Sequence, residues 1–420
     1  MMETATLTRD GGNVEPRVDV PMLFVVMRCP DLAGGGSRHS LAGVKHVRLG
    51  RGKTPYRRAG DELFIELDDR SVSSQHAVIE RAEARWLLQD RGSKNGCYVD
   101  GIRTERATLR DDVMIEIGET LLVYRAPVSL RADDAPDKEL RVDSDVLDTL
   151  LPSLERLFDE VRTVATSRQP IVVHGPTGSG KERVARSVHA LSGRAGDFID
   201  INCAAVPDTL IEAELFGHER GAFSGADSAR AGLIEAASGG TLFLDEIAEL
   251  SPRAQAALLR VLQEGQLRRV GSTTTRDVDI RVVAATHRDL GAMVKKGAFR
   301  EDLYARLAGY TAMLPSLRMR RVDMGVLIAR LLAARDTAPR LRGEAAAALM
   351  RRPWLRNVRE LDQCLGTAAS LARGGTIELG HLPDTAADPD DGPYERDEDA
   401  LRRDVIAALA VAFDMDPAAT

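Results

Sequence analysis

The sequence predicts a multidomain protein: a small all-β sandwich, then an α/β nucleotide-binding domain that carries an α-helical lid. Short apolar stretches separated by turn residues fill positions 20–127, which is typical of a β-sandwich. From residue 146 to 315, strand-like runs alternate with helical patterns, which predicts a parallel sheet with helices on both faces. A glycine-rich loop ending in a lysine lies near the start of this second part and predicts a phosphate-binding site.

The composition is that of an ordinary globular protein, with 44% hydrophobic and 29% charged residues. A length of 420 residues predicts two to three domains. The net charge is −7, so any contact with nucleic acid needs a local basic patch. No secretion signal and no apolar run of membrane-spanning length stand out, so we expect a cytoplasmic protein without membrane contact. The four cysteines are too far apart for a CxxC site, and we expect reduced thiols.

Changes in composition along the chain mark the expected boundaries. Polar segments with few apolar residues predict tails and linkers, whereas periodic apolar patterns predict folded units. The expected units are a flexible tail (1–19), the sandwich (20–127), an exposed linker (128–145), the α/β domain (146–315), the helical lid (316–388), and a linker with a single amphipathic helix (389–420).

Three loops of the sandwich stand out, at Leu49–Arg51, Val72–His76 and Asp90–Gly101. Their order and spacing resemble those of the forkhead-associated (FHA) domain, a sandwich that recognises phosphothreonine peptides. The resemblance implies the following ligand contacts: Arg51 and Ser73 on the phosphate, Lys94 as added charge, and Asn95 on the peptide backbone. An arginine fork and a hydroxyl donor suit a phosphate dianion.

Two positions depart from the FHA pattern. Ser74 stands where the family often has Arg, and Cys97 where it usually has Thr. The alternative interpretation is a sandwich that keeps the fold but packs on its own chain or on a partner without binding phosphate.

The glycine-rich loop follows the apolar run Ile171–Val173 and precedes a helical pattern. Its glycines let backbone N–H groups turn onto phosphate oxygens, while Lys181 and the helix start add positive charge. Glu182 stands where Ser or Thr usually holds magnesium; a purely structural glycine turn is the alternative. The residues expected to bind the nucleotide here are Gly175, Pro176, Thr177, Gly178, Ser179, Gly180, Lys181 and Glu182.

A second apolar run, Thr241–Leu244, ends in two acids. At the carboxyl end of a parallel strand these acids would face the same edge as the glycine-rich loop. Asp245 suits magnesium, and Glu246 suits polarising a water for attack on a γ-phosphate. The alternative for the pair is capping of a helix.

Four strings carry a second resemblance. They are ELFGHERGAFSGAD (214–227), GGTLFLDEI (239–247), LLRVLQEG (258–265) and FREDLYARL (299–307). They resemble the AAA+ domain of bacterial sigma-54-dependent transcription activators, which form hexamer or heptamer rings and hydrolyse ATP to open promoters held by sigma-54 RNA polymerase. The resemblance implies ATP and Mg²⁺ as cofactors, the sigma-54 holoenzyme as a partner, and a homo-oligomeric ring.

The same resemblance implies residue roles. The loop that touches sigma-54 would consist of Gly221, Ala222, Phe223, Ser224, Gly225 and Ala226, with Phe223 as the apolar contact; the alternative is a Gly/Ala turn with a core Phe. The implied catalytic contacts are Asn202 on Glu246, Thr286 and His287 on the γ-phosphate, Arg300 and Arg306 on a neighbouring subunit's nucleotide, and Arg359 from the lid. His287 replaces the usual Asn. The structural alternative for Arg300 and Arg306 is ion pairing at the surface with Glu301 or Asp302.

The sequence therefore predicts an ATPase that activates transcription under the control of a phosphothreonine signal. Two alternatives stay open. One is a scaffold or adaptor with little turnover, supported by His287 and by Leu355-Arg356 in place of the usual Pro-Gly. The other is a remodeller of a different target. The family usually ends in a helix-turn-helix, and only one helical pattern follows residue 400 here, so contact with promoter DNA is an open expectation.

Overall fold

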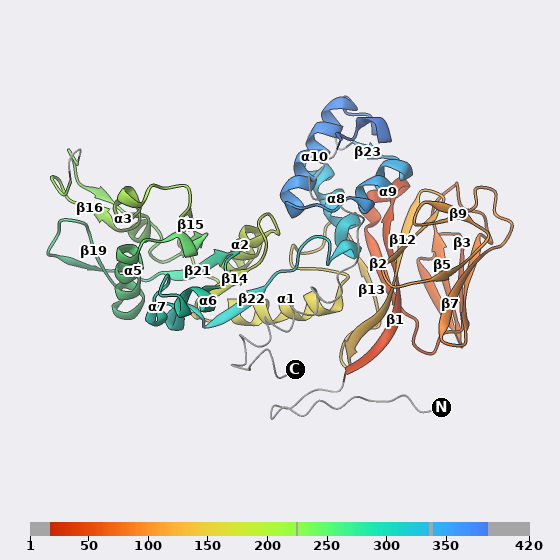
Figure 1. Ribbon diagram of the computed structural model, residues 1–420, viewed down its shortest axis with the longest axis horizontal. Coiled ribbons are helices and arrows are strands. Elements are labelled where there is room, and N and C mark those ends of the chain that lie inside the picture. Colours follow the sequence, from red (N-terminus) through yellow and green to blue (C-terminus); the bar gives the residue numbers. More distant parts are fainter. Residues whose placement is uncertain (1–16, 224–225, 336–338, 385–420) are drawn as a thin grey trace.

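The computed structural model describes residues 17–223, 226–335 and 339–384. Within them the chain forms a β-sandwich, an α/β domain and a helical lid, which confirms the predicted fold class (Figure 1). Most of the predicted N-terminal tail and the predicted C-terminal linker and helix lie outside the described residues. In the described ranges, no helix has both the length and the apolar character needed to cross a bilayer.

The sandwich consists of two sheets. The first sheet contains, in spatial order, β13 (Asp137–Leu140), β2 (Gly36–Ser40), β1 (Arg17–Arg28), β12 (Thr120–Arg131), β11 (Val113–Ile117), β8 (Cys97–Val99) and β9 (Ile102–Thr104). The second contains β10 (Arg106–Leu109), β7 (Arg85–Asp90), β6 (Ala77–Ala82), β3 (His46–Arg51), β5 (Glu62–Leu67) and β4 (Tyr56–Ala59). In β5 the buried and less buried side chains alternate, as expected for a strand that covers the core with one face.

The predicted linker at 128–145 is not an exposed hinge throughout. Strand β12 continues to Arg131, and β13 pairs with β2 at the edge of the first sheet. Leu140 is buried, and Asp137 binds Arg58 of β4 at 2.6 Å. The expectation of exposure was wrong for this part because the charged side chains that indicated a solvated segment form ion pairs with other elements.

The α/β domain has a five-stranded sheet. Its strands, in spatial order, are β15 (Phe198–Asn202), β18 (Thr241–Asp245), β21 (Arg281–Thr286), β14 (Ile171–His174) and β22 (Tyr310–Met313), all parallel. Helices α1 (Pro152–Ala165) and α2 (Lys181–Leu191) pack on one face. Helices α3 (Asp208–Phe216), α5 (Pro252–Glu264) and α7 (Glu301–Leu307) pack on the other. The sheet is thus covered on both faces, and its carboxyl edge carries the glycine-rich loop.

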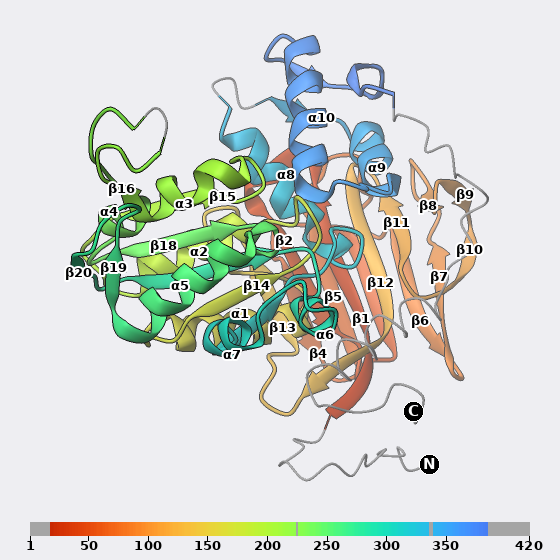
Figure 2. The same ribbon diagram turned by 60° about the vertical axis from the view of Figure 1, so that its left-hand side comes forward.

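The lid is formed by α8 (Met324–Ala333), α9 (Gly343–Arg351) and α10 (Asn357–Leu371). Figures 1 and 2 show these helices next to the first sheet of the sandwich, and α8 contacts β1 while α9 contacts β12. One continuous apolar core contains Phe24 and Val26 of β1 together with Ile328 and Leu349 of the lid. The sandwich and the lid therefore share one apolar core.

Candidate functional site

The glycine-rich loop connects β14 to α2 and encloses a small polar centre. Gly178 and Gly180 have φ angles of +75° and +104°, which L-residues with a side chain rarely adopt. Lys181 is almost completely buried, and its Nζ donates a hydrogen bond to the Gly175 carbonyl at 3.0 Å. The Ser179 hydroxyl is buried and has no hydrogen-bond partner among the described residues. The loop therefore presents a lysine and an unpaired hydroxyl at one place, which fits a phosphate group.

The lid touches this loop directly. Asn357 at the start of α10 donates from Nδ2 to the Thr177 carbonyl at 3.0 Å, and the Val358 N–H donates to the Gly178 carbonyl at 3.0 Å. The buried Arg320 donates from Nη2 to the Ser179 carbonyl at 2.6 Å. The sequence interpretation did not find these contacts. Asn357 lies two residues before Arg359, the lid residue that the resemblance implied, and its own role was not found.

Arg359 lies where the lid meets the loop. A Cβ atom on Gly178 would lie 3.0 Å from the Arg359 Cβ and 2.3 Å from the Arg356 carbonyl oxygen. Gly178 is thus needed for the close approach of lid and loop as well as for its φ angle. Arg359 thus lies beside the loop, and its predicted contact with a nucleotide stays a prediction.

The two acids at the end of β18 lie beside Lys181. Burial and the neighbouring Glu246 raise the pKa of Asp245, while Lys181 opposes the shift. The Glu246 carboxylate is 3.7 Å from the Lys181 Nζ. Two carboxyl groups beside a lysine, at the carboxyl edge of the sheet, offer the oxygen ligands and the positive charge that a magnesium–phosphate group needs.

The partner of Glu246 differs from the implied one. Asn202 Nδ2 lies 3.4 Å from Asp245 Oδ2, because the register of β15 and β18 places these two residues side by side. His287 instead contacts Glu246, with 2.8 Å between its Nδ1 and Oε2. Thr286 is buried at the end of β21, and its hydroxyl accepts the Arg288 N–H at 3.0 Å. His287 is therefore brought to Glu246, whereas Asn202 is brought to Asp245.

Three other predicted residues point to solvent within a single chain. Glu182 binds Arg186 of the same helix at 2.8 Å and is more than half exposed. Arg300 binds Asp302 through two nitrogens, at 2.7 and 3.0 Å, as the surface ion-pair alternative proposed. Arg306 donates to the Leu262 carbonyl at 2.9 Å.

The loop between β16 (Gly217–His218) and β17 (Arg230–Ala231) projects from the α/β domain. Phe223 in this loop is 38% exposed, and its ring lies against His218 with 5.0 Å between centroids. It is therefore not a core residue. Ser224 and Gly225 lie outside the described residues, whereas Gly221, Ala222 and Ala226 lie within them.

A neighbouring segment holds the base of this loop. The Arg269 guanidinium contacts Glu235 at 2.8 Å and Glu219 at 3.5 Å. Gly271 lies so close to Ala222 that an added Cβ would be 2.9 Å from the alanine side chain. Arg269 and Gly271 therefore hold the base of the exposed loop, and the sequence analysis did not find these contacts.

The three FHA-like loops meet at one end of the sandwich. Arg51 is exposed at the end of β3, the Ser73 hydroxyl accepts the Lys94 N–H at 3.2 Å, and Asn95 Nδ2 donates to the Ser71 carbonyl at 2.6 Å. The structure thus brings all four predicted phosphopeptide residues into neighbouring loops. Among the described residues, no carboxylate forms an ion pair with Arg51, so its guanidinium is available for an anion.

The buried His76 connects two of these loops by hydrogen bonds. Its Nδ1 accepts the Ser73 N–H at 3.1 Å, so Nε2 carries the proton and donates to the Gly96 carbonyl at 3.1 Å. His76, Asp90 and Cys97 have ligand-type atoms within 4.8 Å of one another. Both imidazole nitrogens are occupied, and burial and Asp90 raise the pKa of the Cys97 thiol, so the cluster is a hydrogen-bonded support and does not fit a metal.

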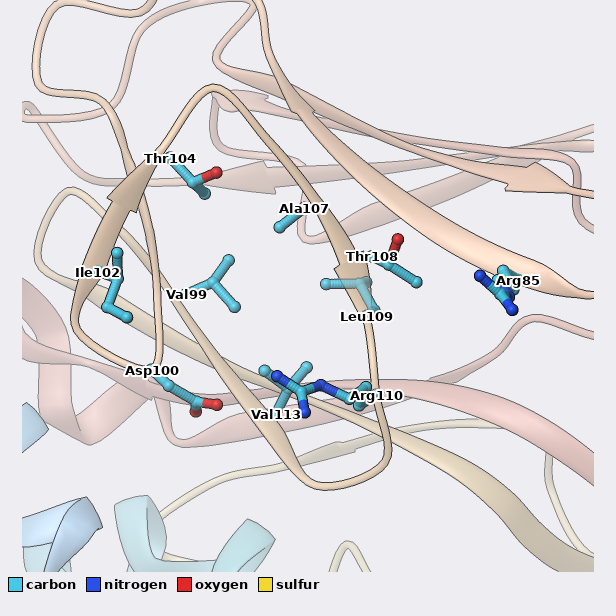
Figure 3. A pocket seen from close by; sticks show the side chains of 10 residues that line it. All are labelled: Arg85, Val99, Asp100, Ile102, Thr104, Ala107, Thr108, Leu109, Arg110 and Val113. Atoms are coloured by element: carbon cyan, nitrogen blue, oxygen red, sulfur yellow. The ribbon is translucent and has the colours of Figure 1, made fainter.

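A separate hollow of about 650 Å³ lies at the open edge of the sandwich, between β8–β9 and β10. Figure 3 shows the side chains of Val99, Ala107 and Leu109 gathered there. Its lining contains none of the predicted site residues.

The folds and loops define a class of protein, an AAA+-type ATPase domain with its lid joined to an FHA domain. Profiles of known families match three parts of the chain: the FHA domain at 47–118, the Sigma-54 interaction domain at 149–312, and the AAA+ ATPase lid domain at 318–398. The chain therefore belongs to the family of sigma-54-dependent transcription activators.

Individual relatives agree with this assignment. The Nif-specific regulatory protein of Azotobacter vinelandii is 46% identical over 254 residues, covering 58% of this chain and 47% of the relative. The transcriptional regulatory protein ZraR of Escherichia coli is 44% identical over 238 residues, covering 55% and 54%. The crystal structure of NtrX from Brucella abortus in complex with ATP has a TM-score of 0.53 at 30% identity, covering 66% of this chain and 67% of NtrX. The chain spans about half the length of the two regulators.

Proposed function

We propose that this chain is a cytoplasmic ATPase that activates transcription by remodelling sigma-54 RNA polymerase, in a hexameric or heptameric ring and under the control of phosphothreonine recognition. The observation that carries the proposal is the meeting of Lys181, Asp245 and Glu246 at one edge of the sheet, with the lid in contact with the glycine-rich loop. The exposed Phe223 in the GAFSGA loop supports the choice of sigma-54 as the target.

The residues fit a magnesium–ATP group. The backbone N–H groups of the glycine-rich loop and Lys181 would hold its phosphates. Asp245 would hold the metal, and Arg359 would reach the nucleotide from the lid. Bound there, the group would supply the phosphoanhydride bond whose hydrolysis drives the proposed remodelling. Glu246 accepts a proton from the attacking water, and His287 orients the Glu246 carboxylate through its 2.8 Å contact.

Arg300, directly before α7, and Arg306, within it, take their proposed role between subunits. Arg300 and Arg306 are exposed in a single chain, and Arg300 is held by Asp302. In a ring, Arg300 would exchange this surface pair for a neighbour's γ-phosphate. A finger of this kind stabilises charge in the transition state and contributes on the order of 10³-fold or more in rate.

A path of contacts supports control by the FHA domain through the lid. Asn95 holds the Ser71 carbonyl, and the Ser71 hydroxyl and the Asp69 carboxylate accept the Glu119 N–H at 3.1 and 2.7 Å. The Glu119 side chain binds Arg342, directly before α9 of the lid, at 2.9 Å. A phosphothreonine that binds between Ser73 and Asn95 would therefore act on loops that contact the lid, and the lid contacts the nucleotide loop.

Open-complex formation at a sigma-54 promoter tests the proposal. The assay uses the full chain at high concentration with sigma-54 holoenzyme and ATP, and compares wild type with Phe223→Ala. Tyr98→Ala removes an equally exposed aromatic ring from the sandwich and is the matched control. We expect wild type and Tyr98→Ala to open the promoter and Phe223→Ala to hydrolyse ATP without opening it.

The other outcomes separate the alternatives. ATP hydrolysis without promoter opening by wild type would favour a different target or a missing activating signal. Binding of ATP without hydrolysis would favour a scaffold. The contacts of Glu246 with His287 and Lys181 support this alternative, because they occupy the carboxylate that would otherwise activate water. A phosphothreonine peptide that changes neither the ATPase rate nor the oligomer size would contradict the proposed control.

A further inference from the structure

A groove of about 450 Å³ lies beside the phosphopeptide residues, on the outer side of the second sheet. Each of the three FHA-like loops contributes to its wall: Arg51 from the first, Ser74 from the second and Arg91 from the third. Phe64 of β5 lies in the wall formed by the sheet. Arg51 thus belongs both to the predicted phosphate contact and to the border of this groove.

The free charge in the groove is positive. Arg48 is neutralised by Glu62 at 2.5 Å, and the Glu66 carboxylate accepts the Thr54 N–H at 2.8 Å. Arg51 and Arg91 are both exposed, and neither forms an ion pair with any residue in the described ranges. Two unpaired guanidinium groups on neighbouring loops therefore face the same hollow.

Ser74 borders the groove with a short side chain. Gly50 lies directly under this residue, since a Cβ on Gly50 would be 2.1 Å from the Ser74 carbonyl oxygen. Ser74, with its short side chain, stands where FHA domains often have Arg. Arg91 of the next loop lines the same hollow, so this loop brings a cation to the groove where Ser74 brings none.

We infer that this groove binds a second anionic side chain of the phosphothreonine peptide, with Arg91 as the residue that selects it. The anion is a second phosphate group or a carboxylate, because the planar fork of a guanidinium binds both in a bidentate manner. The inference rests on the proposed phosphothreonine recognition and adds the class of peptide, one that is acidic or doubly phosphorylated. Arg51 lies between the two anions and contributes to both.

The test measures peptide binding to the full chain by fluorescence anisotropy. The first probe is a peptide with one phosphothreonine in an alanine background. Further probes add an aspartate, or a second phosphothreonine, at each flanking position in turn. We expect one or two positions at which the added anion tightens binding about tenfold, as charge-assisted hydrogen bonds do.

Variants assign this gain to the groove. Arg91→Ala removes the gain and leaves affinity for the singly phosphorylated peptide within about twofold. Arg51→Ala weakens binding of all the peptides, and Arg85→Ala, an exposed arginine at the far end of β7, changes none of them. A gain that persists in Arg91→Ala, or the absence of any favoured position, overturns the inference.

Two results distinguish a failure of phosphothreonine recognition from a failure of the groove alone. If no phosphothreonine peptide binds and Arg51→Ala has no effect, the proposed recognition fails and this inference fails with it. If the singly phosphorylated peptide binds in an Arg51-dependent manner but no added anion helps, only the inference on the groove fails. Arg91-dependent binding of a single-stranded oligonucleotide with the affinity of the best peptide would also overturn it, by assigning the groove to nucleic acid. The phosphate and carboxylate series show which anion is preferred.

Discussion

A Cβ atom on Gly325 would lie 1.8 Å from the carbonyl oxygen of Val26. Gly325 is in α8 of the lid and Val26 is in β1 of the sandwich, so the lid helix rests on the backbone of the strand. This contact has no room for any side chain at position 325. The lid and the FHA domain are therefore fitted to each other through direct contact of their backbones at this point.

Replacing Gly325 separates the two units. We expect Gly325→Ala to destabilise the protein by about 1–3 kcal/mol, since the added methyl group has to displace a strand. Gly366→Ala is the matched control, because its nearest neighbour is the flexible end of Arg335 at 3.5 Å. Thermal unfolding and limited proteolysis measure the effect, and a Gly325→Ala variant as stable as the control would contradict the tight contact. If control runs through the lid, Gly325→Ala also uncouples the ATPase rate from phosphopeptide.

The contact of His287 with Glu246 predicts a role in orienting the catalytic acid. We expect Glu246→Gln to lower kcat by about 10² or more while ATP still binds, as for removal of a general base. His287→Ala should lower kcat about tenfold with little change in KM, because the loss concerns the transition state. His287→Asn keeps a hydrogen-bond donor and should restore most of the rate. A higher kcat in His287→Ala would show instead that the histidine restrains Glu246.

The ion pairs of Arg269 predict that a change at this residue affects sigma-54 binding but leaves ATP hydrolysis intact. Arg269 binds Glu235 and Glu219 at the base of the exposed loop, and within the described ranges none of its ion pairs involves a predicted residue of the nucleotide site. We expect Arg269→Ala to keep the ATPase rate but to weaken sigma-54 binding by about 0.5–2 kcal/mol, the usual range for residues that position a site from a distance. Arg253→Ala removes an exposed arginine from α5 and should affect neither measurement. An equal loss of ATPase activity would place Arg269 in the motor itself.

Local patterns in the sequence were sufficient for the nucleotide loop. The apolar run before Gly175 and the helical pattern after Lys181 are encoded within a few residues, and the structure has both elements. The partners of Glu246 were not encoded in this way. Whether Asn202 meets Asp245 or Glu246 depends on the register of two parallel strands, which are joined by a long crossover and leave no local signal.

The docking of the sandwich on the lid left a signal that was not used. Met22, Phe24 and Val26 of β1 face the lid, while Leu23 and Val25 face the core of the sandwich. An unbroken apolar run indicates a strand covered on both faces, whereas a sandwich strand with one solvated face alternates. The contacts of Arg320 with the nucleotide loop had no such signal, because they join segments that lie far apart in the chain.

Burial of His39 in β2 predicts that stability depends on pH. Its Nε2 lies 2.9 Å from the Ser37 hydroxyl, and burial lowers the pKa of His39 more than its neighbour Asp137 raises it. Below the unfolded pKa of about 6.5, the unfolded chain gains a proton that the folded chain refuses, so stability falls as pH drops from 7 towards 5. Although burial opposes it, hydrogen bonding to Arg58 and His39 lowers the pKa of Asp137, so its contribution is lost only in stronger acid.

Thermal unfolding across this pH range checks the assignment to His39. His39→Asn retains a hydrogen-bonding side chain but cannot titrate, so its melting temperature should fall less between pH 7 and pH 5 than that of wild type. His46→Asn, a change of a half-buried histidine at the start of β3, is the control. If both variants follow the wild-type curve, the acid sensitivity arises elsewhere in the molecule. If His39→Asn alone is flatter, the interface of β2 and β13 is the part of the FHA domain that acid opens first.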